Sequence, residues 1–426
     1  MKKLLFITIL AIIGLRASAQ TAYITNGGSN SVSVIDVSTN IVTNTITGFN
    51  GPAGVSVSSD GSRVYITNYE SNTVNVINTA TNTVIDSIIV GSQPYGIAVS
   101  PDGLRAYVAI TSNNTVSVIN TTTDTVIANI VVGAYPDDLS VSPDGSMVYV
   151  ANYNSGTVSI INSVTDTVSN TIPALGQFEG IIVSPDGSKL YCTNTNGNTV
   201  SVINTSTNNV LAIINVGTRP WGISVSPDGS KVFVVNEGGA SVSVINAAIN
   251  TVTATIPSGY QPMGVSVSPD GNKVYVANSL GNAISVINTT TNNVSATITV
   301  GNNPCAFGNF ISSYGMGIAP HSPPTGEAGQ LPAISVYPNP NNGKFQVSSP
   351  KSQISSITIY NVLGEEVYQS FVNSHSSTGI SLMTTAPITN TPITIDLSNN
   401  SSYPSGVYVV QVRTNEGVSV NKFIKE

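Results

Sequence analysis

Charged side chains are scarce in this sequence. Asp, Glu, Lys and Arg together make up 8% of its 426 residues, whereas an ordinary globular protein has about 25%. Asn, Thr, Ser and Val stand in their place, and this mixture favours β-strands and polar turns over helices. The formal net charge of −7 offers no positive field for phosphates, so we exclude nucleic acid as a partner.

Histidine and cysteine are nearly absent, with two residues of each. His321 and His375 both follow the repeats described below, so the repeats contain no histidine. This absence excludes Ser-His catalysis and most zinc sites in the repeats. Cys192 and Cys305 stand in repeat copies that are three apart, which predicts that no disulfide joins them.

Only one long apolar run is present, from Leu4 to Leu15, with two lysines before it and the small residues Ala-Ser-Ala after it. This pattern is typical of a secretory signal peptide, which we assign to residues 1–19. No later run is long enough to cross a bilayer as a helix. The sequence therefore predicts an exported protein without a transmembrane segment.

An internal repeat fills most of the chain. VSPDGSMVYVANYNSGTVSIIN at residues 141–162 recurs with small changes, and its turn glycines are 42 residues apart: Gly61, Gly103, Gly145, Gly187, Gly229 and Gly271. Each unit has four short runs that alternate apolar and polar residues, separated by Pro-Asp-Gly or Asn/Thr-rich turns. Four antiparallel strands at this period are typical of a β-propeller blade.

The number of copies predicts how the ring closes. The motif Tyr-Val-x-Asn and its variants begin at Tyr23, Tyr65, Tyr107, Tyr149, Tyr191, Phe233 and Tyr275, so we expect seven blades within residues 20–312. The first copy lacks an inner strand, and a spare one begins at Pro304. We predict that residues 304–312 pair with residues 22–48, which completes the seventh blade without leaving an open edge.

The chain changes character after the repeats. Residues 313–332 are rich in Gly and Pro and are interpreted as a linker. Residues 333–426 alternate apolar and polar residues without the 42-residue period, which predicts a small all-β sandwich of immunoglobulin-like type. A polar insertion from Ser374 to Pro392 is interpreted as a long loop.

Two resemblances follow from these residues. Residues 21–312 resemble the YVTN family of β-propellers, known from archaeal surface-layer proteins and from bacterial surface or periplasmic proteins. The tail resembles the type A sorting domain of the type IX secretion system of Bacteroidetes. Its matching residues include Tyr337, Pro338, Asn339, Pro340, Gly343, Gly364, Gly406, Tyr408 and Lys422.

The second resemblance implies a route and a destination. It implies passage through the periplasm and delivery across the outer membrane by the type IX machinery, through residues 333–426. The mature protein is then expected on the cell surface, anchored to lipopolysaccharide, or released outside the cell. Neither resemblance names a ligand.

Strand order assigns the loops to two faces of the ring. The Pro-Asp-Gly turns and the Asn/Thr turns share one face, here called the turn face. There we expect a ring of solvated basic residues, which contributes little to stability: Arg63, Arg105, Lys189, Lys231 and Lys273. The loops between blades and those between the second and third strands share the opposite face, here called the variable face, because the copies differ there.

We place the candidate ligand site on the variable face and expect a shallow acidic and aromatic bowl near the channel mouth. Aromatic rings beside carboxylates and amides suit sugars, cations or peptide side chains. The candidate residues are Tyr69, Glu70, Tyr95, Tyr135, Asp137, Asp138, Tyr153, Glu179, Arg219, Trp221, Glu237 and Met263.

Our preferred interpretation is a monomeric, non-catalytic module that binds an extracellular glycan or protein and needs no cofactor or metal. One alternative is a structural or adhesive surface protein without a discrete site. A less favoured one is a propeller enzyme with Asp137 and Glu179 as acid and base. Asp137, Asp138 and Glu179 also have the oxygen ligands of a calcium site, but no loop has a dedicated calcium spacing.

Overall fold

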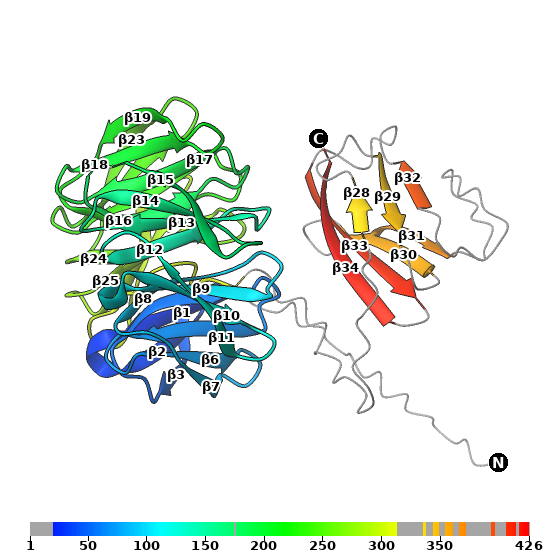
Figure 1. Ribbon diagram of the computed structural model, residues 1–426, viewed down its shortest axis with the longest axis horizontal. Coiled ribbons are helices and arrows are strands. Elements are labelled where there is room, and N and C mark those ends of the chain that lie inside the picture. Colours follow the sequence, from blue (N-terminus) through cyan, green and yellow to red (C-terminus); the bar gives the residue numbers. More distant parts are fainter. Residues whose placement is uncertain are drawn as a thin grey trace, which may run out of the picture. The chain divides into compact units, whose positions relative to one another are not determined.

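The computed structural model describes residues 20–173 and 176–312, together with the backbone of seven strands between residues 335 and 425. The chain divides into two units, Met1–Pro320 and His321–Glu426, which are described separately (Figure 1). The predicted signal peptide (1–19), linker (313–332) and polar insertion (374–392) lie outside the described residues.

Six four-stranded antiparallel sheets follow one another along the chain, with their strands in chain order. Blades 1 to 3 comprise β4 (Pro52–Val57), β5 (Arg63–Asn68), β6 (Thr73–Asn78), β7 (Thr83–Ile89), β8 (Pro94–Val99), β9 (Arg105–Ile110), β10 (Thr115–Asn120), β11 (Thr125–Val131), β12 (Pro136–Val141), β13 (Met147–Asn152), β14 (Thr157–Asn162) and β15 (Thr167–Ile172). Blades 4 to 6 comprise β16 (Phe178–Val183), β17 (Lys189–Asn194), β18 (Thr199–Asn204), β19 (Val210–Asn215), β20 (Pro220–Val225), β21 (Lys231–Asn236), β22 (Ser241–Asn246), β23 (Thr251–Pro257), β24 (Pro262–Val267), β25 (Lys273–Asn278), β26 (Ala283–Asn288) and β27 (Asn293–Thr299).

The seventh blade joins the two ends of the ring. Its three N-terminal strands are β1 (Thr21–Asn26), β2 (Ser31–Asp36) and β3 (Ile41–Thr47). The amide of Tyr23 donates to the Phe310 carbonyl at 2.9 Å, and the amide of Cys305 donates to the Thr25 carbonyl at 2.9 Å. The predicted all-β, seven-bladed propeller and its closure by residues 304–312 are therefore confirmed.

The closing strand is longer than its counterparts. Seven residues separate Pro304 from Ile311, yet their partners Asn26 and Ala22 are four apart. In blade 1, five residues separate the corresponding positions, and their partners are also four apart. The closing strand thus carries two extra residues, which correspond to Phe307-Gly308. They bulge toward the propeller axis, where the Phe307 carbonyl accepts a hydrogen bond from the Val55 amide of blade 1 at 2.7 Å.

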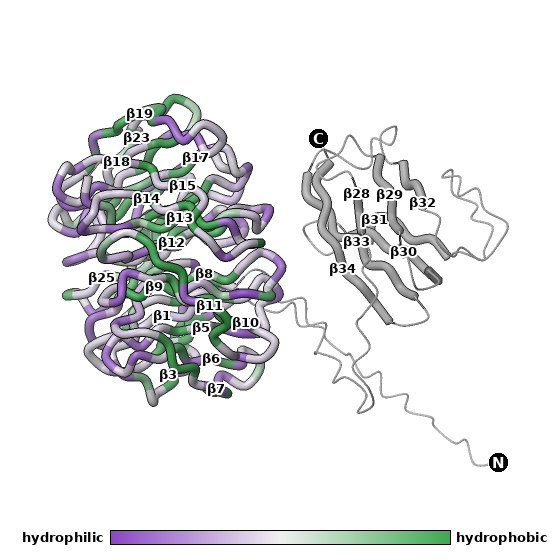
Figure 2. The backbone as a smooth tube through the Cα atoms, in the orientation of Figure 1, coloured by the Kyte–Doolittle hydropathy of each residue, from purple (hydrophilic) through white to green (hydrophobic). Residues whose placement is uncertain are grey.

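The core lies between neighbouring blades, where Val, Ile and Tyr side chains of the two middle strands are almost fully buried. Figure 2 shows apolar residues along the strands and polar residues at many of the turns. Near the axis the inner strands approach closely, since a Cβ added to Gly222 would lie 2.3 Å from the Met263 carbonyl oxygen. Cys192 and Cys305 are both buried and free. In the described part of the chain, no helix is long and apolar enough to cross a membrane; the helical segments are the short 3-10 turns η1 (Gly27–Ser29) and η2 (Thr111–Asn113).

The basic residues of the turn face differ from the prediction, because they are not simply solvated. Arg63 donates from Nη1 to the Thr121 carbonyl at 2.8 Å and pairs with Asp124 at 3.0 Å. Lys273 donates from Nζ to the Val37 carbonyl at 2.6 Å. Each of these two side chains crosses to a turn of the next blade and donates to a backbone carbonyl there. These cations therefore link blades around the ring.

The described strands of the C-terminal unit form two antiparallel sheets, ordered β28-β29-β32 and β31-β30-β33-β34. Their strands are β28 (Ser335–Tyr337), β29 (Lys344–Ser348), β30 (Ile354–Tyr360), β31 (Glu366–Phe371), β32 (Ile393–Asp396), β33 (Gly406–Thr414) and β34 (Gly417–Lys425). Among the predicted motif residues, Tyr337, Gly406, Tyr408 and Lys422 lie in strands, and Pro338, Asn339, Pro340, Gly343 and Gly364 lie outside the described residues. The immunoglobulin-like sandwich itself stays a prediction.

Candidate functional site

The loops between blades position the candidate residues of the variable face. The inner strands of five of blades 1 to 6 begin at a proline, and β16 begins at Phe178 instead. The residue before that proline often has a positive φ: 57° at Tyr135 and 51° at Arg219. This left-handed conformation is unusual for a large side chain. Asn114 and Asn198 fix it by accepting hydrogen bonds from the amides of Tyr135 and Arg219, both at 2.8 Å. The strain is therefore compensated by neighbouring loops, and strain of this kind often accompanies functional sites.

Aromatic side chains gather at the start of the inner strands, around Phe307. The Phe307 ring centroid lies 5.2 Å from that of Tyr95 and 6.1 Å from that of Trp221. Tyr69 meets Tyr95 edge to face, with centroids 6.1 Å apart. Among the described residues, the buried indole Nε1 of Trp221 has no hydrogen-bond partner. The predicted aromatic residues thus do gather here, and the Trp221 Nε1–H is a hydrogen-bond donor without an acceptor among the described residues.

A second aromatic pair lies nearby. The rings of Tyr135 and Tyr153 have centroids 5.9 Å apart and are tilted by 55°. Burial, followed by the charges of Tyr69 and Asp137, raises the pKa of Tyr135 to about 12. Both residues are only partly buried, so part of this pair is exposed to solvent.

Arg219 supplies the cation of this surface. Its Nε atom lies 3.0 Å from Glu237 Oε2, and the side chains are 54% and 6% exposed, respectively. Gln261 donates from Nε2 to the other carboxylate oxygen of Glu237 at 2.8 Å. Glu237 therefore holds two neighbouring loop side chains in place, while the guanidinium group remains open to solvent.

The carboxyl groups do not form the open acidic bowl that we predicted. Asp137 and Glu179 are each only 5% exposed. Burial, followed by the hydrogen bond and charge of Glu179, raises the pKa of Asp137 well above its usual range. Burial also raises the pKa of Glu179, although its hydrogen bond to Asp137 opposes that shift. A hydrogen bond between two carboxyl groups requires a proton on one of them, and the raised pKa of Asp137 favours this shared-proton form. Both side chains are buried because the inner strands of the ring converge around them and exclude water.

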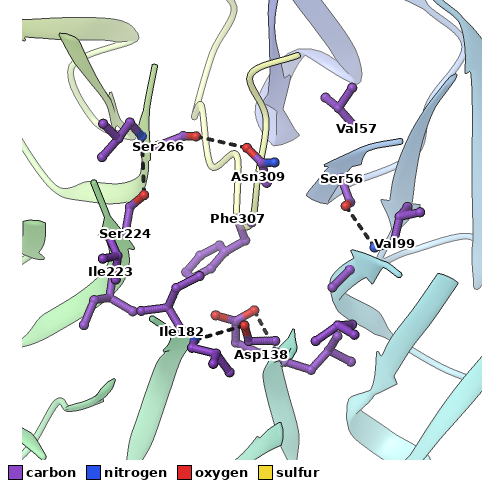
Figure 3. A pocket seen from close by; sticks show the side chains of 18 of the residues that line it. Ser56, Val57, Val99, Asp138, Ile182, Ile223, Ser224, Ser266, Phe307 and Asn309 are labelled. Atoms are coloured by element: carbon purple, nitrogen blue, oxygen red, sulfur yellow. Dashed lines mark hydrogen bonds between the residues drawn. The ribbon is translucent and has the colours of Figure 1, made fainter. Parts of the chain in front are cut away.

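Asp138 was predicted in the bowl on the variable face but lies elsewhere. It lines an axial cavity of about 470 Å³ that lies toward the turn face, with Phe307 beside it (Figure 3). Its carboxylate accepts hydrogen bonds from the amides of Leu139 at 2.8 Å and Ile181 at 3.1 Å. Sequence reasoning missed both this cavity and Phe307. The two extra residues in the closing strand were the available signal.

Two predicted residues stand apart from the rest. Glu70 is exposed and Met263 is partly buried, and in the described ranges neither side chain takes part in a hydrogen bond or ion pair. Among those residues, no group of three His, Cys, Asp or Glu side chains is arranged to hold a metal ion. The geometry thus offers no support for the calcium alternative at Asp137, Asp138 and Glu179.

Three family models match parts of the chain. A secretion system C-terminal sorting domain matches residues 335–426. A YNCE-like β-propeller matches residues 11–105 and 223–308. A model described as a lactonase with a seven-bladed β-propeller matches residues 78–180. Both predicted parts, the seven-bladed propeller and the sorting domain, are confirmed by these matches, and the sorting domain indicates secretion to the cell surface or extracellular space.

Solved structures agree on the fold of the repeats. The chain is 26% identical to hydrazine synthase of Kuenenia stuttgartiensis, with a TM-score of 0.59, and the match covers 63% of this chain and 92% of that chain. It is 18% identical to a functionally unknown protein from Desulfotomaculum acetoxidans, with a TM-score of 0.58 and coverage of 68% and 99%. The second likeness shows the fold alone. No curated protein sequence matches this chain at a significant level.

Proposed function

We propose that this chain, a seven-bladed β-propeller followed by a secretion-system sorting domain, works outside the cell as a non-catalytic binding module. The type IX machinery delivers it through residues 333–426. The mature protein is a monomer that is either anchored to lipopolysaccharide or released. Its ligand is an extracellular glycan or protein that contacts the variable face.

One observation carries this proposal. The buried Nε1 of Trp221, the only tryptophan in the sequence, lacks a hydrogen-bond partner among the described residues. It lies where the copies of the repeat differ, two residues along the chain from Arg219, whose side chain is 54% exposed. The Trp221 ring packs on Phe307, which also contacts Tyr95. Aromatic faces with a few polar groups favour recognition of sugars or peptide side chains, and rigid scaffolds commonly carry such sites on loops.

A thermal-shift screen of the full chain against polysaccharide fragments and matrix proteins tests the proposal. A ligand at about one hundred times its Kd adds about 2.7 kcal/mol to the free energy of unfolding. The substitutions Tyr153→Ala and Arg219→Ala should abolish that shift, because both side chains are accessible. Leu104→Ser, at a residue that is 56% exposed on the turn face, is the matched control. A shift that survives both variable-face substitutions would contradict the proposed surface.

A catalytic role is the second candidate, because the lactonase model covers residues 78–180 and this segment includes the Asp137–Glu179 pair. Two carboxyl groups that share a proton can act as acid and base. Hydrolysis of a panel of lactones by the wild-type chain, lost in Glu179→Gln, would favour this role over simple binding. Equal rates in both proteins would argue against it.

A structural or adhesive role is the remaining alternative. Outer strands expose large apolar side chains, such as Ile89 at 79% and Val131 at 75%. If bulk adhesion is the function, a variant with Ile89→Thr and Val131→Thr should lose surface adhesion, and the variable-face substitutions should have no effect. The binding proposal predicts the opposite pattern in the same adhesion assay.

A further inference from the structure

The axial cavity is a pocket with one open end. Exposed prolines at the beginning of the Pro-Asp-Gly turns line its mouth on the turn face: Pro101, Pro185 and Pro227. At its deep end lies Phe307, a residue that is 2% exposed and whose ring also contacts Tyr95 and Trp221 of the variable face. The cavity is therefore separate from the candidate site on the variable face. Its volume of about 470 Å³ falls within the usual range for small-molecule pockets.

The walls are mainly apolar, with a partial ring of hydroxyl groups. Ile and Val side chains of the inner strands supply most of the surface. The hydroxyl oxygens of Ser56, Ser140 and Ser224 accept hydrogen bonds from backbone amides of the adjacent blades, at 3.1 to 3.3 Å. Figure 3 shows those of Ser56 and Ser224. Each of these oxygens is thus used as an acceptor, and each hydroxyl proton remains available to a bound molecule.

Asp138 is the one ionisable side chain on the wall of this cavity, as far as the described residues show. Asp138 as a whole residue is 8% exposed. Its carboxyl group accepts two hydrogen bonds of the roughly four that a carboxylate can accept. The titratable groups nearest to it on the packed strands are Asp137, Glu179 and Cys192. None of these supplies a positive charge, so the pocket lacks a counter-ion for Asp138.

The fold does not require a carboxyl group at this position. Five other inner strands have glycine there: Gly54, Gly96, Gly180, Gly222 and Gly264. Those strands form the same sheet without the side chain. The acidic residue in blade 3 places a negative charge in a low-dielectric pocket, where it is costly unless something compensates it.

We propose that the axial cavity binds a small organic ammonium ion, with Asp138 as its counter-ion and Phe307 as an aromatic floor. The carboxylate attracts the positive charge strongly in a pocket with little water. The Phe307 ring provides cation–π attraction. The apolar walls accommodate alkyl groups on the nitrogen, and the seryl hydroxyls can donate to an oxygen elsewhere in the molecule.

Calorimetric titration of the full chain with choline tests this site, and 3,3-dimethylbutan-1-ol is the control because it has the same shape without the charge. We expect choline to bind, and the neutral alcohol to bind at least about tenfold more weakly, as a single close charge pair predicts. Asp138→Gly and Asp138→Asn should both lose choline binding. Phe307→Leu should weaken it by about 2- to 5-fold.

Three further measurements make the result decisive. Choline should bind more tightly at pH 8 than at pH 6, because the pKa of Asp138 is raised to about 7, first by burial. Tyr153→Ala, on the variable face, should leave choline binding unchanged, which separates this site from the proposed glycan or protein site. A circular dichroism spectrum like that of the wild type establishes that each Asp138 variant is folded.

Several outcomes would overturn the proposal. These are an absence of choline binding, equal binding of choline and the neutral alcohol, or choline binding that persists in folded Asp138→Gly or Asp138→Asn. Asp138→Asn keeps the side-chain volume, so a loss of binding in this variant is attributable to charge and not to a collapsed cavity.

Discussion

Phe307 packs against Tyr95 with ring centroids 5.2 Å apart and ring planes tilted by 50°. Phe307 comes from the strand that closes the ring, and Tyr95 comes from the second blade, so this contact crosses the propeller axis region. Phe307 also lines the axial cavity. One side chain therefore separates the cavity from the aromatic cluster of the variable face, and this role underlies the first prediction.

Phe307→Ala should destabilise the propeller by about 3 kcal/mol, in the range measured for buried aromatic residues replaced by alanine. Phe307 is almost fully buried, packs against Tyr95 and lines the cavity, so its truncation removes contacts on both sides. Urea unfolding monitored by fluorescence of Trp221 measures the change. Phe307→Leu, which fills most of the volume, should cost less than half as much. A loss below about 1 kcal/mol in Phe307→Ala would show that the ring is not part of the packed core.

The stability of the propeller should depend on the ionisation of Asp138. The folded-state pKa is raised to about 7, whereas an unfolded Asp has a pKa of about 3.9. The folded chain therefore binds more protons between these values, and the free energy of unfolding falls as pH rises from about 4 to 7. The difference of about three pKa units corresponds to about 4 kcal/mol at most.

Asp138→Gly should remove this part of the pH dependence, so that the variant gains stability relative to wild type at pH 8 and not at pH 4. Thermal unfolding across this range measures it. Asp137 and Glu179 shift in the same direction, so a smaller slope should remain. Asp144→Ser is the opposite control: hydrogen bonds from Ser142 and Ser146 lower the pKa of Asp144, so it contributes stability at neutral pH that is lost on acidification. Identical pH profiles for wild type and Asp138→Gly would contradict the assignment.

Lys273→Met should reduce the free energy of unfolding by about 1.5 kcal/mol or more, as expected for a hydrogen bond to a charged group. Its Nζ donates to Val37 at 2.6 Å, which ties blade 6 to the N-terminal blade. Met147 occupies the corresponding position in blade 3, so methionine is compatible with the strand. Lys231 donates to the Thr289 carbonyl and so links two blades that are adjacent in sequence. Lys231→Met loses this bond and should reduce the free energy of unfolding by a similar amount. If neither variant has a lower free energy of unfolding than the wild type, these cations are solvated charges that contribute little to stability.

Truncation before Pro304 should abolish the closed ring. Without residues 304–312, β1 loses the hydrogen bonds that Tyr23 makes to Phe310 and that Cys305 makes to Thr25, and its edge becomes open to other chains. We expect oligomers or aggregates by size-exclusion chromatography. Truncation after Ser312 should leave a monomeric propeller with wild-type thermal unfolding. If the protein truncated before Pro304 is monomeric and stable, β1 to β3 alone complete the ring.

The sequence predicted the propeller because the same pattern of strand and turn residues recurs in every repeat. Each copy places Val and Ile at alternating positions and a positive-φ glycine, such as Gly145 at 75°, in its first turn. Blade number followed from counting, and closure followed from a strand missing at one end and spare at the other. Local patterns and their period were sufficient, because each blade packs mainly against its neighbours.

The sequence also placed Tyr69, Tyr95 and Trp221 on one face. Tyr69 contacts Tyr95, and Tyr95 and Trp221 both contact Phe307. It could not predict burial. Asp137 and Glu179 were expected on an open surface, and only the convergence of seven inner strands on one axis removes them from water. The distance from the axis is a property of the closed ring, and no single copy contains it.

The surroundings of Asp138 and Phe307 also could not be predicted from the sequence. The sequence contains an aspartate where other copies have glycine and two extra residues after Pro304. What these changes mean depends on strands that are far apart in the chain and meet only when the ring closes. Local alternation thus determined the strands, the blades and their number. The tertiary structure alone decided which side chains share the axis, which are buried there, and that a cavity with a single carboxylate opens toward the turn face.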